Sequence, residues 1–205
     1  MDIFLVLLGI VGAYLLGTVS SAYILVKIVK GEDIRECGSG NAGATNAARV
    51  LGKLPGFLVL VFDILKGIIA VVFIANFIVQ RVDIALPIIK ALLGLSVVCG
   101  HVFNVFLQFK GGKGVATSAG VLLCLCPIAV LFGMIIFLAV VIITKYVSLG
   151  SIVCSILIPF LMLGFKAPYA YVILASILCV IIVAKHKANI NRLLTGRERK
   201  AFGKK

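Results

Sequence analysis

Long apolar stretches alternate with short polar segments along this chain. Residues 3–26 carry no charge, and further apolar stretches run through residues 54–78, 84–107, 114–144, 146–165 and 167–184. An α-helix needs about 20 predominantly apolar residues to cross a bilayer, so the pattern predicts a series of membrane-spanning helices. The first stretch is interpreted as a span and not as a secretory signal peptide. Asp2 stands where basic residues are expected, and no small-residue cleavage site follows.

The stretch 114–144 decides the number of spans. It contains Pro127 and forms either one long helix or two short helices that turn there. Lysine and arginine gather at the cytoplasmic ends of spans. Lys27 and Lys30 follow the first span, and eight Lys and Arg residues occur from Lys185 onward. Only an odd number of spans places both the lysines after the first span and the basic tail on the cytoplasmic side. We therefore expect a helix break near Pro127, seven transmembrane helices, an outside N-terminus and a cytoplasmic C-terminus.

The composition agrees with this fold class. Hydrophobic residues make up 62% of the 205 residues and charged residues only 13%, whereas soluble domains are about 45–50% apolar. We expect one all-α integral membrane domain over residues 1–205, with cytoplasmic motif segments near 31–53, 108–117 and 185–200. The net charge of +13 reports orientation first, and without a soluble basic domain it does not indicate nucleic acid. The six cysteines are interpreted as small hydrophobes, because five of them lie in or beside apolar runs.

The first polar segment, Gly38–Asn46, mixes three glycines with hydroxyl and amide side chains, and Arg49 and Lys53 follow it. Glycine lets a backbone approach a ligand closely, and successive exposed N–H groups form an anion-binding nest. Arg49 adds a planar bidentate donor. An ordinary helix-capping loop is the alternative interpretation. Nine such residues beside a membrane favour an anion-binding function.

The second segment, Phe109–Gly114, is rich in glycine and lysine and leads to Thr117. It suggests a glycine-rich loop that opens a helix, where backbone N–H groups and the positive helix end favour phosphate. It is not a Walker A motif, because Gly114 follows Lys113 where that motif has Ser or Thr. A tight interhelical turn with cytoplasmic lysines is the alternative, and this segment alone does not decide between the two.

The third segment lies in the basic tail. His186, Asn189 and Leu193 fall on one helical face. Glu198 is the only acidic residue after Asp83, and it is either a counter-ion for its basic neighbours or a residue that positions Arg or His. Adhesion to anionic lipid explains the tail's charges, but it does not explain His186 or Asn189.

Asp63, Lys66, His101 and Asn104 are polar residues inside predicted spans that need an explanation. Asp63 and Lys66 are three apart, and we expect them to pair as supporting structure. His101, near Asn104, is interpreted as a packed, hydrogen-bonded helix contact. No metal site is expected, because two histidines have no carboxylate or thiolate cluster near them in sequence. No G-x-S-x-G nucleophile elbow occurs either.

Together these segments resemble the bacterial acyl-phosphate-dependent glycerol-3-phosphate acyltransferases of the PlsY type. The matching parts are Gly38–Asn46 with Arg49, Phe109–Thr117, and the tail pattern from His186 to Glu198. Asp63-x-x-Lys66-Gly67 and Gly100-His101 fit the family pattern as well. The resemblance covers the whole chain in order and hydropathy, and its motifs are specific in combination.

The resemblance implies an activity and a set of site residues. An acyl group passes from acyl phosphate to the 1-hydroxyl of glycerol 3-phosphate, giving lysophosphatidic acid and phosphate at the entry to phospholipid synthesis. The implied residues fall into three groups. The catalytic set is Ser39, Arg49, Lys113, His186, Asn189 and Glu198. Glycerol 3-phosphate is held by Ser39, Arg49, Lys113, His186 and Asn189. Acyl phosphate is bound by Asn41, Thr45, Asn46, Gly111, Gly112, Gly114 and Thr117.

The implied setting is the bacterial inner membrane, with the site on the cytoplasmic face. Membrane lipid is a partner; no cofactor, nucleic acid or obligate protein partner is expected. No carboxylate–histidine dyad is evident, so a substrate phosphate, whose second pKa is about 6, is the expected proton acceptor. A small transporter for a phosphorylated metabolite is the rival function, although polar residues concentrated at one face disfavour it. A non-catalytic lipid-binding scaffold explains the tail but not the two glycine-rich segments.

Overall fold

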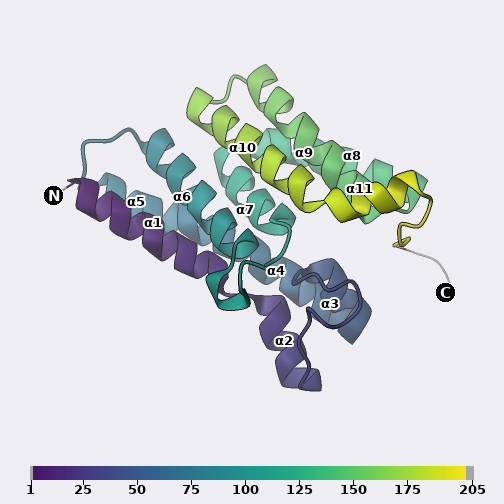
Figure 1. Cartoon of the computed structure of the whole chain (residues 1–205). Helices are drawn as coiled ribbons and strands as arrows, with labels where there is room; N and C mark the ends of the chain where they lie inside the picture. The colour runs from purple at the N-terminus through teal and green to yellow at the C-terminus, as the bar shows by residue number, and fades with distance from the viewer. Residues whose placement is uncertain (1, 202–205) are drawn as a thin grey trace. The chain divides into compact units, whose positions relative to one another are not determined.

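Helices form all the regular secondary structure that is described, and short loops join them (Figure 1). The computed structural model describes residues 2–201, the side chain of Asp2 excepted. The α-helices are α1 (Asp2–Thr18), α2 (Ser21–Lys30), α3 (Ala44–Leu51), α4 (Lys53–Ile69), α5 (Ala75–Val79), α6 (Leu86–Val102), α7 (Val115–Leu125), α8 (Pro127–Thr144), α9 (Val147–Gly164), α10 (Tyr169–Lys185) and α11 (Lys187–Leu194). A π-helix, η1 (Ala70–Ile74), joins α4 to α5, and a 3₁₀-helix, η2 (Val105–Leu107), follows α6.

Five helical stretches are long and apolar enough to cross a membrane. They are Ile3–Lys30, Lys53–Val79, Leu86–Leu107, Pro127–Thr144 and Val147–Gly164. A sixth arises if α10 and α11, which are bent by 59° at His186, count as one span. The described residues therefore form a multi-pass membrane protein with five or six candidate spans by length and composition. Helix α7 is apolar but only 11 residues long, so the expected seven spans stay a prediction.

The helix break expected near Pro127 is confirmed. Helix α7 ends at Leu125, α8 begins at Pro127, and Cys126 between them is not helical, with φ −150° and ψ 77°. Proline disfavours the helical conformation of the residue before it. It fits the first turn of a helix, where its missing N–H is not needed. Pro127 therefore ends one helix and starts the next.

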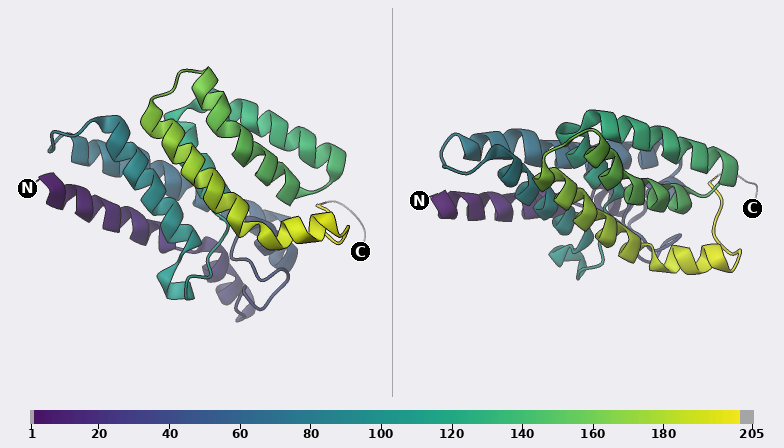
Figure 2. Two further views of the ribbon diagram at one scale, coloured as in Figure 1. Left: turned by 45° about the horizontal axis from the view of Figure 1, so that its top comes forward. Right: turned by 90° about the horizontal axis from the view of Figure 1, so that it is seen from above.

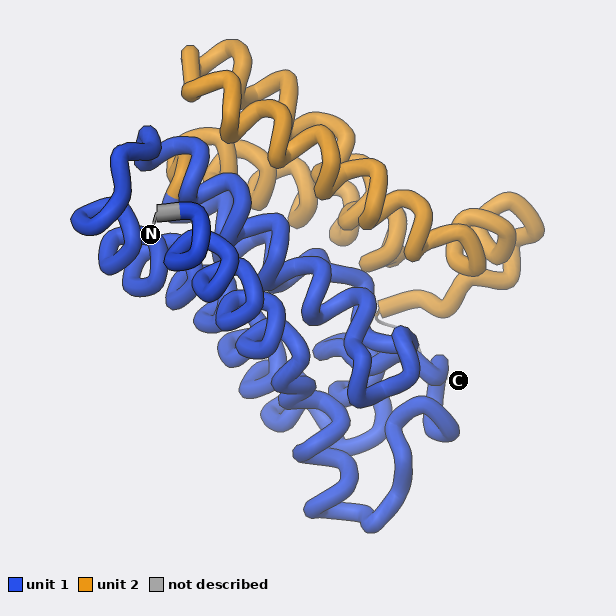
Figure 3. Tube along the Cα trace, turned by 60° about the vertical axis from the view of Figure 1, so that its left-hand side comes forward, with its two compact units in different colours: residues 1–124 blue, residues 125–205 orange. Residues whose placement is uncertain are grey.

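The chain divides into two compact units, residues 1–124 and 125–205 (Figure 3). In unit 1, α1 packs along α6, α4 and η1 lie beside them, and α3 packs on α4. In unit 2, α9 contacts both α8 and α10, and the three helices stay side by side in both views of Figure 2.

Glycines allow the close approach of α1 and α6. A Cβ atom on Gly17 would collide with the carbonyl oxygen of Val97, and one on Gly100 would collide with that of Tyr14. Lipid tails are as apolar as leucine, so close packing and hydrogen bonds hold such helices together. Hydrogen bonds cross the same contact, since Ser96 Oγ donates to the Ile10 carbonyl at 2.7 Å.

The helix is interrupted between α1 and α2, although the sequence stays apolar through this break. Asn104 Nδ2 donates to the Thr18 carbonyl at 2.7 Å, and Lys66 Nζ donates to the Gly17 and Val19 carbonyls at 3.3 Å each. A carbonyl left unpaired in an apolar medium is costly. Lys66 from α4 and Asn104 from the N-cap of η2 thus stabilise the break.

We predict that Gly100→Ala lowers the melting temperature of the purified protein in detergent. The added methyl group has to force α1 and α6 apart, and overpacking of this kind costs about 1–3 kcal/mol. Gly12→Ala in α1 is the matched control, because a Cβ atom there meets nothing within 4 Å. Equal melting temperatures for the two variants would show that α1 and α6 are not closely packed at Gly100.

Candidate active site

Asn46 shapes the loop of the first motif segment. Its Oδ1 accepts from the Ser39 N–H at 2.7 Å, and its Nδ2 donates to the carbonyls of Ile34 at 3.3 Å and Cys37 at 3.0 Å. Gly38 and Gly40 adopt positive φ in the turn that these bonds close. The Asn46 side chain is 1% exposed. Its amide therefore stabilises the loop, and the contact of Asn46 with acyl phosphate stays a prediction.

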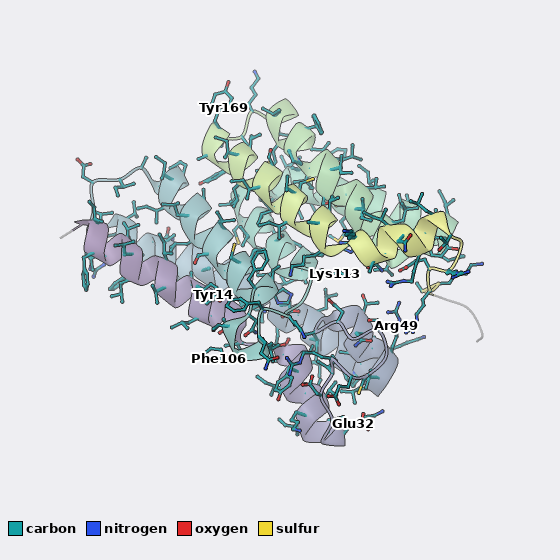
Figure 4. All side chains as sticks on the ribbon, viewed as in Figure 1. Tyr14, Glu32, Arg49, Phe106, Lys113 and Tyr169 are labelled. Carbon is teal, nitrogen blue, oxygen red and sulfur yellow. The ribbon has the colours of Figure 1, made fainter. Side chains whose placement is uncertain are left out.

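The other predicted residues of this segment are more exposed to solvent than Asn46. Ser39 and Thr45 are exposed and Asn41 is half-buried. Arg49 lies on α3 (Figure 4), four residues after Thr45 and hence on the same helical face. The backbone N–H of Ser39 donates to Asn46 Oδ1, and this bond fixes Ser39 next to the first turn of α3.

The second motif segment is built on His101. The Gly112 N–H donates to the His101 carbonyl oxygen at 3.1 Å. A Cβ atom on Gly111 would collide with that oxygen, and one on Gly112 would collide with Nε2 and Cε1 of the His101 ring. The Gly112 N–H is thus bonded within the protein, and the contact of Gly112 with acyl phosphate stays a prediction. Gly114, with φ +85°, adopts a conformation that disfavours other residues.

The first two motif segments meet in unit 1. A Cβ atom on Gly112 would lie 3.0 Å from the carbonyl oxygen of Ala42, and Ala42 lies between Asn41 and Gly43 in the first segment. Lys113 stands on the segment that enters α7 (Figure 4). Thr117, in the first turn of α7, is fully buried, and its Oγ1 has no hydrogen-bond partner among the described residues. Its contact with acyl phosphate stays a prediction.

A buried ion pair lies behind the second segment. Lys66 Nζ is 2.9 Å from Asp63 Oδ1, which confirms the pairing expected from their spacing. Lys66 Nζ is also 2.7 Å from His101 Nδ1, which confirms His101 as a packed, hydrogen-bonded contact. Sequence reasoning missed the link between this pair and the glycines. The sequence did offer one indication of this link, because Gly100-His101 and Lys66-Gly67 both fit the family pattern.

The third motif segment belongs to unit 2. His186 ends α10, and its Nδ1 donates to the Ile182 carbonyl at 2.8 Å. Because a carbonyl only accepts, Nδ1 carries the ring proton in this bond. In the neutral ring, Nε2 is then the acceptor nitrogen.

Glu198 holds α11 to the start of α9. Its Oε1 accepts from Ser148 Oγ at 3.0 Å and from Asn189 Nδ2 at 2.7 Å, and its Oε2 accepts from Arg192 Nε at 2.8 Å. The Glu198 side chain is 4% exposed. Burial alone raises the pKa of Glu198, but these hydrogen bonds together hold that pKa below its usual value. Both carboxylate oxygens thus bond to residues of unit 2, and the catalytic role of Glu198 stays a prediction.

The geometry thus gives two groups of predicted site residues. Unit 1 joins the Ser39–Arg49 region to the second segment, and unit 2 joins Asn189 to Glu198. Within residues 2–201, no group of three or more His, Cys, Asp and Glu side chains gathers where a metal ion would bind.

Comparison with known proteins gives one consistent family. A family model described as glycerol-3-phosphate acyltransferase matches residues 7–196. Glycerol-3-phosphate acyltransferase of Clostridioides difficile strain 630 is 45% identical over 208 residues, covering 100% of both chains. Glycerol-3-phosphate acyltransferase 2 of Moorella thermoacetica is 42% identical, covering 95% of this chain and 96% of that one.

A solved structure is also similar. The crystal structure of PlsY (YgiH), an integral membrane glycerol 3-phosphate acyltransferase, in its glycerol 3-phosphate form superimposes with a TM-score of 0.87. The two sequences are 39% identical, and the match covers 97% of this chain and 96% of that chain.

The lowered pKa of Glu198 predicts a dependence of stability on pH. The ionised carboxylate contributes fully above the ordinary glutamate pKa, and its contribution is lost as the pH falls through the lower folded-state pKa. Glu198→Gln should lower the melting temperature at pH 7 and weaken its fall on acidification in that window. Hydrogen bonds to a charged group contribute about 1.5–3 kcal/mol, and the lower end applies here because Arg192 is 40% exposed and screened by solvent.

Glu36→Gln, at an exposed carboxylate, is the control and should leave the melting curve unchanged. Identical acid profiles for the wild type and Glu198→Gln would contradict the assigned role.

Proposed function

Because the chain belongs to the glycerol-3-phosphate acyltransferase family, we propose that it uses acyl phosphate as its acyl donor. The chain is a membrane enzyme that acylates glycerol 3-phosphate in phospholipid synthesis. The observation that carries this conclusion is its likeness, over nearly its full length, to an enzyme solved in the glycerol 3-phosphate form. Acyl phosphate is consistent with a backbone segment shaped by glycines beside two lysines, Lys110 and Lys113.

The proposed reaction is one acyl transfer. The 1-hydroxyl oxygen of glycerol 3-phosphate attacks the carbonyl carbon of acyl phosphate, an ester C–O bond forms, and the bond from that carbon to the phosphate oxygen breaks. The products are lysophosphatidic acid and inorganic phosphate. The hydroxyl proton passes to a substrate phosphate oxygen, whose second pKa of about 6 suits a general base near neutral pH.

We assign glycerol 3-phosphate to Arg49, Lys113, His186 and Asn189, with Ser39 orienting the reacting hydroxyl. The exposure of Ser39 beside α3 supports its role. The bond from Asn189 Nδ2 to Glu198 supports a fixed amide at position 189. Because His186 Nδ1 is held by a carbonyl, we assign His186 as a hydrogen-bond partner of the substrate.

We propose that acyl phosphate binds to the second segment and to the more exposed residues of the first segment. We assign its phosphoryl group to the amides of Gly111 and Gly114, with Asn41 and Thr45 as side-chain donors. Gly112, Asn46 and Thr117 complete the proposed acyl-phosphate site. The Gly112 N–H and the Asn46 amide also bond within the protein, which holds the two segments in shape.

We also propose seven spans, with α7 as the short one, an outside N-terminus and the active site at the cytoplasmic face of a bacterial membrane. The distribution of Lys and Arg supports this topology. A reporter that is active only in the cytoplasm should be active when fused after Lys205. Activity of a periplasm-specific reporter there would contradict the topology.

Transfer is distinguished from transport by one assay. We expect purified protein in sealed vesicles, given acyl phosphate and glycerol 3-phosphate, to form lysophosphatidic acid and phosphate without accumulating glycerol 3-phosphate in the lumen.

Arg49→Lys should raise KM for glycerol 3-phosphate about tenfold or more, because an ammonium cannot replace a bidentate guanidinium.

Arg81→Lys is the control, because Arg81 stands over the Phe77 ring at 3.8 Å, at the end of α5, and should keep the wild-type KM. Uptake of glycerol 3-phosphate without product would favour the transporter.

A further inference from the structure

We propose that His101, held by the buried Asp63–Lys66 pair, is a positioning residue that shapes the donor-binding segment at Gly111 and Gly112. The inference rests on the proposed role of that segment in binding acyl phosphate. His101 touches the segment at two points, its carbonyl oxygen and its ring edge.

The ion pair gives His101 a rigid support. The Asp63 and Lys66 side chains are only 3% and 6% exposed. Asp63 Oδ1 also accepts from Ser21 Oγ at 3.2 Å, and Lys66 Nζ also donates to two carbonyls at the α1–α2 break. A buried charge pair is stable only when its remaining donors and acceptors are satisfied, and here both members have additional partners. Movement of Lys66 would break several bonds at once.

The same pair sets the orientation of the His101 ring. An ammonium group has donors but no acceptor, so Lys66 donates to Nδ1 in the 2.7 Å contact. The ring proton of the neutral imidazole then lies on Nε2. With Nδ1 fixed on Lys66, the Nε2–Cε1 edge occupies the space that a side chain at Gly112 would need.

The two glycines therefore meet different parts of one residue. A methyl group at Gly112 collides with ring atoms that a substitution at His101 removes, whereas a methyl group at Gly111 collides with the His101 carbonyl, which every substitution retains. General core packing predicts no such difference.

The test is a double-mutant cycle on the purified protein in lipid nanodiscs. Gly112→Ala and Gly111→Ala are each made alone and together with His101→Asn, because asparagine keeps an acceptor for Lys66 but lacks Nε2 and Cε1. We expect Gly112→Ala alone to raise KM for acyl phosphate about tenfold or more, with KM for glycerol 3-phosphate little changed. In the His101→Asn background, the same substitution should raise KM for acyl phosphate about threefold or less.

Gly111→Ala is the matched control, and its effect on KM for acyl phosphate should be equally large in both backgrounds. Ser96→Ala removes another buried hydrogen bond of α6; it should lower the melting temperature without changing KM for acyl phosphate. His101→Ser provides the same comparison if His101→Asn does not purify as a single species.

Equal effects of Gly112→Ala in the two backgrounds would overturn the inference, as would relief of Gly111→Ala by His101→Asn. A rise in both KM values together would also overturn it, because it would indicate general loss of structure. In each of these cases an active wild type leaves the proposed function standing. A wild type that forms no lysophosphatidic acid from acyl phosphate overturns the proposed donor and this inference with it.

Discussion

A charge pair inside an apolar helix bundle persists only if the protein supplies all of its hydrogen bonds, and the Asp63–Lys66 pair imposes this requirement on unit 1. Removing one partner of such a pair costs about 3–5 kcal/mol. The requirement explains why α1 and α2 break where they do, since Lys66 bonds to carbonyls that the break frees. It also explains why His101 lies on α6 with Nδ1 toward Lys66. The pair thus connects three spans to the glycine-rich segment.

This arrangement relates to the chemistry through preorganisation. A backbone that binds phosphate is effective when its N–H groups already point at the ligand, so that binding does not have to order them. The second segment has irregular backbone, with positive φ at Phe109 and Gly114 and at Gln108 just before it, and its shape depends on neighbouring residues. His101 on one side and Ala42 on the other provide that support. In unit 2, Glu198 accepts a hydrogen bond from Asn189. In both units, candidate site residues are thus held in place by hydrogen bonds within the protein.

Local patterns predicted much of the fold. Hydropathy located the apolar stretches, Pro127 marked a break between helices, and the spacing of Asp63 and Lys66 indicated their pairing. The break between α1 and α2 was missed because the sequence stays apolar through it, and the stabilising donors come from distant residues. For the candidate site, sequence identified the segments but not which polar groups the protein itself uses. The bonds of Asn46 to its own loop, for example, could not be predicted from the sequence, because their partners are backbone carbonyls.

The central claim is that backbone amides of the second segment hold the phosphoryl group of the donor. Protein labelled with ¹³C-carbonyl lysine and ¹⁵N-glycine contains only four Lys-Gly peptide bonds, which report on Gly31, Gly67, Gly111 and Gly114. Solid-state ³¹P–¹⁵N distance measurement with a bound, unreactive acyl phosphonate would test them in one sample. The account predicts dephasing of the Gly111 and Gly114 amides and none at Gly31 or Gly67. Dephasing at neither Gly111 nor Gly114, with the phosphonate bound, would contradict it.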